Sequence, residues 1–405
     1  MRICIFTHTF PRFPGDTTAP FMGNFAEALC KEGHEVTVLL PFDTSFKKRV
    51  KIPYKIEIYR YIYPQFLHRL GYSRTLKGDK GLKLEAYFLS PFLFLFGFFA
   101  LLRLVKDKKV DIISSHWIIP NGFIAALVYK ITGVPFTVTI PGSDVYLGGK
   151  NKLFRFMTEF AAKEAKVVLA DNEVYIQQLR ALGIKPKRTF IIPYGVNTEK
   201  FKPIKKDKKI LNTLGIENGT KIILAVGRLV QKKGFLYLIG AMPMILKIQG
   251  KVKLVIVGDG DQKQKLLDEV KRLKIEDGVI FAGSISYNEL ARYYNIGDIF
   301  VMPSIRDEFG NIDASPVAMM EAMACGTPVV ATKYALSGNF LEKGKIGFIV
   351  KDKDSKDISR AVIVLLKRNG RRDREEIRLK AIENFSTTSI AQKYTQVLKL
   401  AINNK

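Results

Sequence analysis

Two carboxylates lie at the beginning of an expected helix, where they could bind a ligand. Asp313 stands just before this helix and Glu321 lies about a turn and a half inside it. Ser315-Pro316 predicts the helix start, because Ser accepts from free N–H groups and Pro has no N–H to leave unpaired. Free N–H groups and the positive end of the helix dipole favour an anion or a polyhydroxylated ligand. The alternative is that Asp313 only caps the helix and Glu321 is a solvated surface residue.

Two cations follow an apolar strand earlier in the chain. Arg228 and Lys233 come directly after the expected strand 222–226. An α/β sheet presents ligands at the carboxyl ends of its strands. Arg can bind a diphosphate through two parallel hydrogen bonds, and Lys adds a point charge. The pair therefore favours a nucleotide diphosphate, whereas the alternative is two solvated cations in a basic protein.

A strand–loop–helix–strand unit must position the two carboxylates. The apolar run 299–302 predicts the first strand, and Gly326 followed by Pro328 ends the helix before the second strand. So short a unit implies parallel strands joined by a right-handed crossover. The chain opens with the same order of elements, with strands expected at 2–6 and 36–40. The pattern predicts an α/β protein with doubly wound sheets.

The residues around these motifs resemble a known family. From Glu321 to Val330 the chain reads E-A-M-A-C-G-T-P-V-V. With Asp313, this resembles the Glu–seven residues–Glu signature of the retaining glycosyltransferases of family 4 (glycosyl transferases group 1). The family usually has Glu where this chain has Asp313, which shortens the reach to a sugar hydroxyl by one methylene. The segment G-R-L-V-Q-K-K-G, from Gly227 to Gly234, is similar to the family's G-R-L-x-x-x-K-G.

The resemblance implies the GT-B fold. In this α/β fold two Rossmann-like doubly wound domains face a cleft, and the C-terminal helix packs back on the N-terminal domain. We expect an acceptor-side domain at 1–204, a nucleotide-sugar-binding domain at 205–385 and the returning C-terminal helix at 386–405. The polar, basic segment 201–209 is the expected linker between the domains.

The resemblance also implies roles for the side chains of the donor site. Arg228 and Lys233 would neutralise the charge that builds on the departing diphosphate. Asp313 would hold the donor sugar, and these three residues are the catalytic candidates. Glu321 would hold the ribose hydroxyls of the donor.

Backbone groups complete the expected donor site. The backbone at Ala314 and Ser315 would hold the donor sugar together with Asp313. Gly258 follows one strand and would let the backbone approach the nucleotide, and Gly283 ends another strand that should meet the base. These are expectations from the resemblance.

The acceptor side is expected in the N-terminal half. Gly15 lies in a Gly- and Pro-rich loop, His116 begins H-W-I-I-P-N-G, and Asp144 ends P-G-S-D. The family commonly has H-G-x-D at the last place, and its His is proposed to help hold the donor sugar. Pro141 replaces that His here, so His116 or His8 could stand in for it. Asp144 could instead be an ordinary turn or helix-capping residue.

No cofactor is expected beyond a nucleotide diphosphate sugar as co-substrate. The chain has no G-x-G-x-x-G, so it does not support a nicotinamide cofactor. Asp259 and Asp261 imitate the metal-binding D-x-D of another glycosyltransferase fold, and we interpret the match as accidental. A metal is not expected to be required, because Arg228 and Lys233 can stabilise the leaving group.

The amino-acid composition limits which binding partners and which cellular compartment are expected. The 405 residues favour two domains, and 47% of them are hydrophobic. Three cysteines in no metal or redox spacing favour a reducing compartment, and we expect no signal peptide at the N-terminus, which leads straight into an expected strand. The net charge of +27 suggests nucleic acid, an acidic membrane face or phosphorylated substrates. The excess is densest over 47–83, where aromatic residues are interleaved; a solvated Lys-rich surface is the alternative.

The segment 87–105 is strongly apolar. Its uninterrupted apolar core, 92–102, is shorter than the roughly twenty residues of a membrane-spanning helix. We therefore expect a helix that is buried in the core. Partial insertion into one leaflet, helped by the adjacent basic stretch, and a transmembrane span remain alternatives.

These observations lead to one functional hypothesis and two rivals. We expect a retaining, hexosyltransferase-type glycosyltransferase that moves a sugar from a nucleotide diphosphate sugar to a glycan or lipid-linked acceptor, in the synthesis of cell-surface polysaccharide or glycolipid. It would be cytoplasmic or peripheral on the inner face of the membrane, and nucleic acid is not an expected partner. One rival is another GT-B enzyme, such as a nucleotide-sugar epimerase. The other is a basic module that binds nucleic acid or anionic lipid.

Overall fold

The computed structural model describes residues 1–16, 18–47, 51–63, 65–68, 70–72, 84–308, 310–313, 317–335, 346–367 and 371–403. The chain separates into two units. Unit 1 contains Met1–Gly195 and Thr387–Lys405, and unit 2 contains Val196–Ser386. The chain therefore passes from one unit to the other at two places.

Unit 1 is built on a parallel sheet in the order β3-β2-β1-β4-β5-β6-β7. Its strands are β1 (Arg2–Phe6), β2 (Glu35–Pro41), β3 (Lys55–Tyr59), β4 (Ile112–His116), β5 (Phe136–Ile140), β6 (Val167–Ala170) and β7 (Thr189–Ile191). The central strands are almost continuous buried runs, which is typical of parallel strands that helices cover on both faces.

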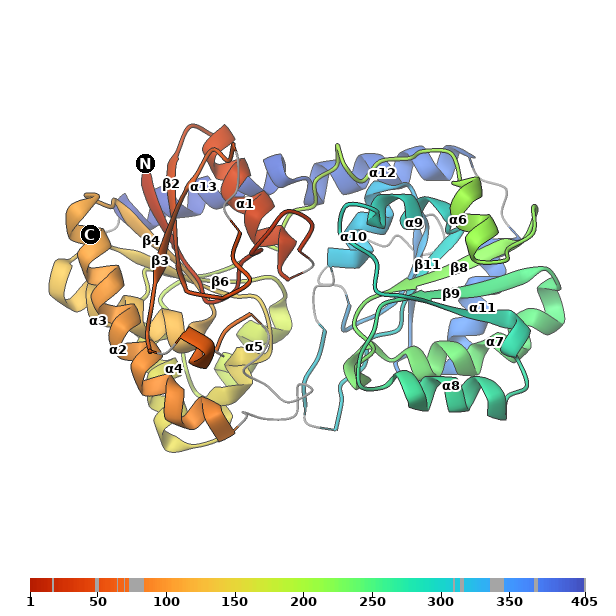
Figure 1. Cartoon of the computed structure of the whole chain (residues 1–405), viewed down its shortest axis with the longest axis horizontal. Helices are drawn as coiled ribbons and strands as arrows, with labels where there is room; N and C mark the ends of the chain where they lie inside the picture. The colour runs from red at the N-terminus through yellow and green to blue at the C-terminus, as the bar shows by residue number, and fades with distance from the viewer. Residues whose placement is uncertain are drawn as a thin grey trace. The chain divides into compact units, whose positions relative to one another are not determined.

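Helices cover both faces of this sheet. They are α1 (Pro20–Lys31), α2 (Leu84–Asp107), α3 (Phe123–Thr132), α4 (Lys152–Glu164), α5 (Glu173–Ala181) and α13 (Thr387–Asn403). Figure 1 shows α1 and α13 together on one face and α2 and α3 on the other. Ile390 and Leu398 of α13 are buried in one apolar core with Phe25 of α1 and Ile5 of β1. The prediction that the C-terminal helix packs on the N-terminal domain is confirmed.

Unit 2 repeats the architecture with a parallel sheet in the order β10-β9-β8-β11-β12-β13. Its strands are β8 (Lys221–Val226), β9 (Val252–Val257), β10 (Val279–Gly283), β11 (Ile299–Met302), β12 (Val329–Thr332) and β13 (Gly347–Val350). Its helices are α6 (Lys208–Thr213), α7 (Phe235–Gln249), α8 (Lys263–Arg272), α9 (Leu290–Ile296), α10 (Val317–Ala324), α11 (Ser355–Leu366) and α12 (Arg371–Phe385). Two cores fill the two faces, one with α7, α8 and α11 and the other with α6, α9, α10 and α12 (Figure 1).

The order of strands reverses once in each sheet. The reversal lies between β1 and β4 in unit 1 and between β8 and β11 in unit 2. Ligands of open α/β sheets bind at the carboxyl ends of the strands at such a reversal. The prediction of two doubly wound domains is confirmed, and it directs attention to the loops after β1, β4, β8 and β11.

The boundary between the units differs from the expected one near residue 205. The structure divides the chain between Gly195 and Val196, so the segment 201–209 belongs to unit 2. Phe201 is fully buried in a core of that unit, and the Ile204 N–H donates to Asn295 Oδ1 at 2.8 Å. The Asp207 side chain then caps α6. A polar, basic composition resembles a linker, but its few apolar and capping residues anchor this segment.

The apolar segment 87–105 forms the greater part of a single helix of 24 residues, α2. It is the one helix among the described residues that is long and apolar enough to cross a membrane by length and composition. Only 33% of its most apolar stretch is buried in the structure. The expectation of a helix buried in the core is therefore only partly met.

Candidate functional site

The reversal in unit 2 brings two predicted catalytic residues into contact. Lys233 lies on the loop that joins β8 to α7, and Asp313 lies on the segment that leads from β11 to α10. Lys233 Nζ is 2.6 Å from Asp313 Oδ2, and the two side chains are only 11% and 19% exposed. The ion pair is thus largely sheltered from solvent.

Close backbone packing holds Lys233 in this place. Gly234 adopts a left-handed φ of 68°, and a Cβ there would lie 1.9 Å from the carbonyl oxygen of Pro303. The Ile305 N–H also donates to the Lys232 carbonyl at 2.9 Å. The loop after β8 is therefore pressed against the chain that leaves β11, and only glycine fits at the point of approach.

Three cations determine the charge of Asp313. Burial favours its neutral form, but the charges of Lys233, Lys232 and Arg228 outweigh burial and lower the pKa of Asp313. The carboxylate is therefore ionised at neutral pH and can accept hydrogen bonds from hydroxyl groups. Arg228 is exposed and lies in the same loop as Lys233, so the three catalytic candidates interact electrostatically.

Glu321 is not a solvated surface residue, which overturns that alternative. It is buried in α10, and the Tyr294 hydroxyl of α9 donates to Glu321 Oε2 at 2.7 Å. Burial raises the pKa of Glu321 to about 7, against the opposing effects of the Tyr294 hydrogen bond and the Lys200 charge. A buried carboxylate with a pKa this high is typical of functional sites.

Lys200 is a further basic residue that interacts with Glu321, and sequence reasoning missed it. Its side chain packs against the ring of Tyr287. Lys200 Nζ lies 3.5 Å from the centre of the Tyr287 ring and 3.3 Å from Asn288 Oδ1. Burial lowers the pKa of Lys200 to about 8, although the Glu321 charge raises it. No motif marks Lys200, because its partners come from distant parts of unit 2.

Gly258 and Gly283, the two glycines expected at the nucleotide, differ in why the structure has glycine at each position. Gly258 has a φ of 139°, and a Cβ there would lie 1.9 Å from the Gly227 carbonyl oxygen. The packing of the strand ends therefore requires glycine at 258 without any ligand. Gly283 has a φ of 72°, its carbonyl accepts from the Gly258 N–H at 2.8 Å, and no described atom lies within 4 Å of an added Cβ. Space beside Gly283 is thus compatible with a ligand.

Two further donor-site predictions lie outside the described residues. Ala314 and Ser315 belong to the undescribed segment 314–316, together with the expected helix start at Pro316. The described part of α10 begins at Val317. Asp313 is the last described residue before that segment.

Asp144, the acceptor-side carboxylate, holds a turn in unit 1. Its Oδ2 accepts from the Ile118 N–H at 2.6 Å, next to Trp117, whose φ of 69° is unusual for a non-glycine residue. Burial raises the pKa of Asp144 to about 7 against the hydrogen bonds from the backbone. Asp144 therefore shapes the loop after β4, which agrees with the alternative of a turn residue.

His116 lies in the core, which corrects its assignment to the acceptor side. It is fully buried, with Nδ1 2.5 Å from the Tyr194 hydroxyl and Nε2 3.2 Å from Ser114 Oγ. Burial lowers its pKa to about 3. His8, the other expected stand-in, follows β1 at the reversal of the sheet and is only half-buried. Its ring centre is 4.8 Å from that of Trp117.

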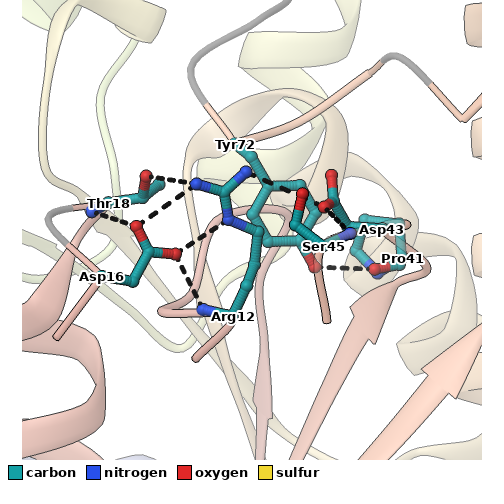
Figure 2. Close-up of polar contacts among 7 residues, drawn as sticks. All are labelled: Arg12, Asp16, Thr18, Pro41, Asp43, Ser45 and Tyr72. Atoms are coloured by element: carbon teal, nitrogen blue, oxygen red, sulfur yellow. Dashed lines mark hydrogen bonds and ion pairs between the residues drawn. The ribbon is translucent and has the colours of Figure 1, made fainter. Parts of the chain in front are cut away.

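Gly15 lies in a loop that an internal ion pair fixes (Figure 2). It has a φ of 84° within the turn in which the Asp16 N–H donates to the Phe13 carbonyl. Arg12 donates from its backbone and from Nε to Asp16 Oδ2, at 2.9 and 2.8 Å, and from Nη2 to Thr18 Oγ1 at 3.0 Å. Sequence reasoning missed this pair, although its spacing of four residues is visible in the sequence.

The structure therefore separates the predictions into two groups. Lys233 and Asp313 touch, Arg228 lies in the Lys233 loop, and Glu321 is buried in the helix that follows Asp313. Gly15 and Asp144 belong to unit 1. Within the described ranges, no group of three or more His, Cys, Asp or Glu side chains could hold a metal ion.

Comparisons with known proteins match both halves of the chain. Residues 206–384 match the model described as "Glycosyl transferases group 1", and residues 17–195 match the "Glycosyl transferase 4-like domain". An uncharacterized glycosyltransferase of Methanocaldococcus jannaschii is 26% identical over 99% of both chains. The alpha-monoglucosyldiacylglycerol synthase of Streptococcus pneumoniae is 26% identical over 82% of this chain and 71% of its own.

Solved structures show a similar fold. Anabaena HepE, determined in complex with UDP, superimposes with a TM-score of 0.72 at 17% identity, over 98% of this chain and 100% of its own. At this identity the likeness concerns the fold. It shows that the two doubly wound units occur together in one known architecture.

Proposed function

The chain belongs to the group 1, family 4-like glycosyltransferases of the GT-B fold, and from this premise we propose that it transfers a hexose from a nucleotide diphosphate sugar with retention of configuration. One observation carries the proposal. The Lys233–Asp313 ion pair lies where the strand order of unit 2 reverses, with Arg228 in the same loop. This arrangement offers cations for a diphosphate next to a carboxylate for sugar hydroxyls.

The donor would bind unit 2 through these groups. Arg228 and Lys233 would contact the diphosphate, and Asp313 would accept hydrogen bonds from the sugar. Glu321 would bind the ribose hydroxyls in its ionised form, and its high pKa makes that binding sensitive to pH. The UDP complex of the HepE structure supports a nucleotide at this fold.

The transfer would break the bond between the anomeric carbon and the diphosphate oxygen. The bonding electrons leave with the diphosphate, whose growing charge Arg228 and Lys233 stabilise. The acceptor hydroxyl attacks the same face of the oxocarbenium-like sugar, and its proton passes to the departing phosphate oxygen. Retention through a covalent intermediate would instead require a carboxylate nucleophile at the anomeric carbon. We assign Asp313 to sugar binding and no residue to that role.

The acceptor would be a glycan or a lipid-linked sugar. The streptococcal relative is named for a glycolipid product, which supports a role in glycolipid or polysaccharide synthesis. Cys4, Cys30 and Cys325 are all free, as in proteins of a reducing compartment. We therefore propose a cytoplasmic enzyme that works at the inner face of a membrane.

A thermal-shift screen with UDP, GDP, ADP and their common sugars tests the donor site. One nucleotide family should raise the melting temperature in a concentration-dependent manner. The shift should be lost in Arg228→Ala and reduced in Glu321→Gln, and it should persist in Lys251→Ala, which removes an exposed cation elsewhere in unit 2. No shift with any nucleotide, together with binding to nucleic acid, would favour the basic-module rival. A nucleotide sugar that is isomerised without an acceptor would favour an epimerase.

A further inference from the structure

Helix α2 exposes a long apolar stripe. Tyr87, Phe88, Phe92, Leu95, Phe96 and Phe99 are between 44% and 70% exposed. Apart from the adjacent pairs Tyr87/Phe88 and Leu95/Phe96, their spacing of three or four residues places them along one side of the helix. A soluble helix normally shows polar residues on that side. The exposed stripe is therefore a feature that the fold of unit 1 does not explain.

The opposite side of α2 is packed into unit 1. Leu93, Gly97 and Leu101 are buried, and a Cβ at Gly97 would lie 3.2 Å from the Tyr59 hydroxyl and 3.3 Å from Ile124 Cδ1. The helix could cross a bilayer only by leaving this packed site. As it stands, α2 lies along the surface of the unit and offers one face to a partner.

Helix α4 extends the apolar surface. Ring centres are 6.1 Å apart between Phe94 and Phe123 and 6.3 Å apart between Phe123 and Phe156. These rings connect α2 through the start of α3 to α4, where Leu153 and Phe156 are exposed. Figure 1 shows the three helices on the same side of unit 1. We call the exposed apolar residues of α2, with Leu153 and Phe156, the docking face.

The docking face is large for a monomer. Its α2 part alone exposes on the order of 600 Å², if a fully exposed aromatic side chain presents about 200 Å². Apolar patches of this size on soluble proteins mark interaction sites. The observation therefore calls for a partner, and the charges around the face indicate which kind.

Cations border the docking face. Exposed Arg103 and Lys106 continue the stripe after Phe99, and exposed Lys152 and Arg155 neighbour Leu153 and Phe156 in α4. Aromatic residues next to Lys and Arg suit the interface of a bilayer, where rings enter the headgroup region and cations meet anionic lipids. A symmetric pair of copies would bring the same cations together, which opposes self-association through this face.

We propose that unit 1 docks on anionic bilayers through this face, with α2 lying in the plane of the membrane. Only the biological purpose of the docking rests on the proposed function. That purpose would be to bring a lipid-linked acceptor to the enzyme. The residues that carry it belong to unit 1, whereas the donor site lies in unit 2. The two proposals can therefore fail separately.

Vesicle sedimentation of the full chain tests the docking. The wild type should bind vesicles of phosphatidylcholine with about 30% phosphatidylglycerol, and binding should weaken with added salt and on pure phosphatidylcholine. Phe92→Glu/Phe96→Glu should weaken binding at least about tenfold, because the carboxylates would enter the apolar boundary. Leu379→Glu is the matched control, since Leu379 of α12 in unit 2 is 66% exposed, and it should bind like the wild type.

Two further variants separate the possible outcomes. Arg103→Glu/Lys106→Glu should reduce binding to the anionic vesicles while leaving the apolar stripe intact. Arg228→Ala should bind vesicles normally even though it loses the donor nucleotide. Equal binding by the wild type and Phe92→Glu/Phe96→Glu, or no binding to anionic vesicles, would overturn the proposal. The alternative outcome is a wild type that forms a dimer in light scattering and binds no vesicles. If Phe92→Glu/Phe96→Glu dissociated that dimer, the docking face would be assigned to a second copy of the chain.

Discussion

Lys233 Nζ lies 2.6 Å from Asp313 Oδ2 and thereby joins the loop after β8 to the segment before α10. These two loops leave the two strands between which the order of the unit 2 sheet reverses. The ion pair keeps Asp313 charged although it is largely buried. In the proposed reaction a diphosphate would compete with Asp313 for the Lys233 cation. Sugar hydroxyls would then donate hydrogen bonds to the Asp313 carboxylate in place of Lys233.

Removal of Lys233 should destabilise the protein in a pH-dependent way. The pKa of Asp313 is lowered in the folded state from its ordinary 3.8, so its contribution to stability is present above that value and is lost as pH falls through the lower folded pKa. Lys233→Met should cost about 3 kcal/mol at neutral pH, because it leaves a buried carboxylate unpaired. Urea unfolding at pH 7 and in acid measures the difference, which should be smaller in acid.

The double variant Lys233→Met/Asp313→Asn is the control for this prediction. It removes both charges, so it should recover most of the stability that Lys233→Met loses at pH 7. Equal stabilities of the single and the double variant would show that the unpaired Asp313 carboxylate carries no cost.

Glu321 should make the stability fall as pH rises. Its folded pKa of about 7 lies above its ordinary 4.5, so the folded state holds a proton more tightly than the unfolded state between these values. The stabilisation is complete below the unfolded pKa and is lost as pH rises through about 7. At about 1.4 kcal/mol per pKa unit, the shift from 4.5 to about 7 corresponds to a loss of at most about 3.5 kcal/mol. The free energy of unfolding of Glu321→Gln should therefore rise relative to that of the wild type between pH 4.5 and 8. A difference that stays constant over this pH range would contradict the burial of the Glu321 charge.

The hydroxyl of Tyr294 should stabilise α9 against α10. It is fully buried and donates to Glu321 Oε2 at 2.7 Å. Above pH 7, where Glu321 is ionised, Tyr294→Phe should cost roughly 1.5–3 kcal/mol, the usual range for a hydrogen bond to a charged group. Tyr63→Phe, which removes an exposed hydroxyl, should change the free energy of unfolding little. Similar effects of both substitutions would show that the buried hydrogen bond is not important.

Gly258→Ala should destabilise the protein without any ligand. The φ of 139° and a contact of 1.9 Å with the Gly227 carbonyl oxygen force the backbone to move. A loss of several degrees in melting temperature is expected for the apo protein. Gly283→Ala meets no described atom within 4 Å of the new Cβ, so only its φ of 72° adds strain and the loss should be smaller. An unchanged melting temperature in Gly258→Ala would return this glycine to a purely ligand-binding role.

The doubly wound architecture and the unit 2 candidates were predictable because local patterns determine them. Buried strands read as short runs of Val, Ile and Leu, and Arg228 and Lys233 follow one such run directly. Asp313 and Glu321 are close in sequence, so the strand–helix–strand unit places them by itself. The contact of Asp313 with Lys233 follows from the strand order, which the resemblance supplied.

The features that sequence reasoning missed depend on contacts between distant segments. His116 ends a strand and could face either way, and Tyr194 and Tyr394 from remote elements bury it. Lys200 meets Tyr287 and acts on Glu321 only in the folded unit. The stripe on α2 looks like core because composition does not reveal which side of an apolar helix is covered.

Calorimetric titration of the nucleoside diphosphate that stabilises the protein, compared with its monophosphate, tests the central claim most directly. The wild type should bind the diphosphate at least about tenfold more tightly, because Arg228 and Lys233 contact the second phosphate. Arg228→Ala should reduce diphosphate affinity towards that of the monophosphate and leave monophosphate binding unchanged, while Lys251→Ala should alter neither. An Arg228→Ala variant that keeps the full preference for the diphosphate would contradict the proposed donor site.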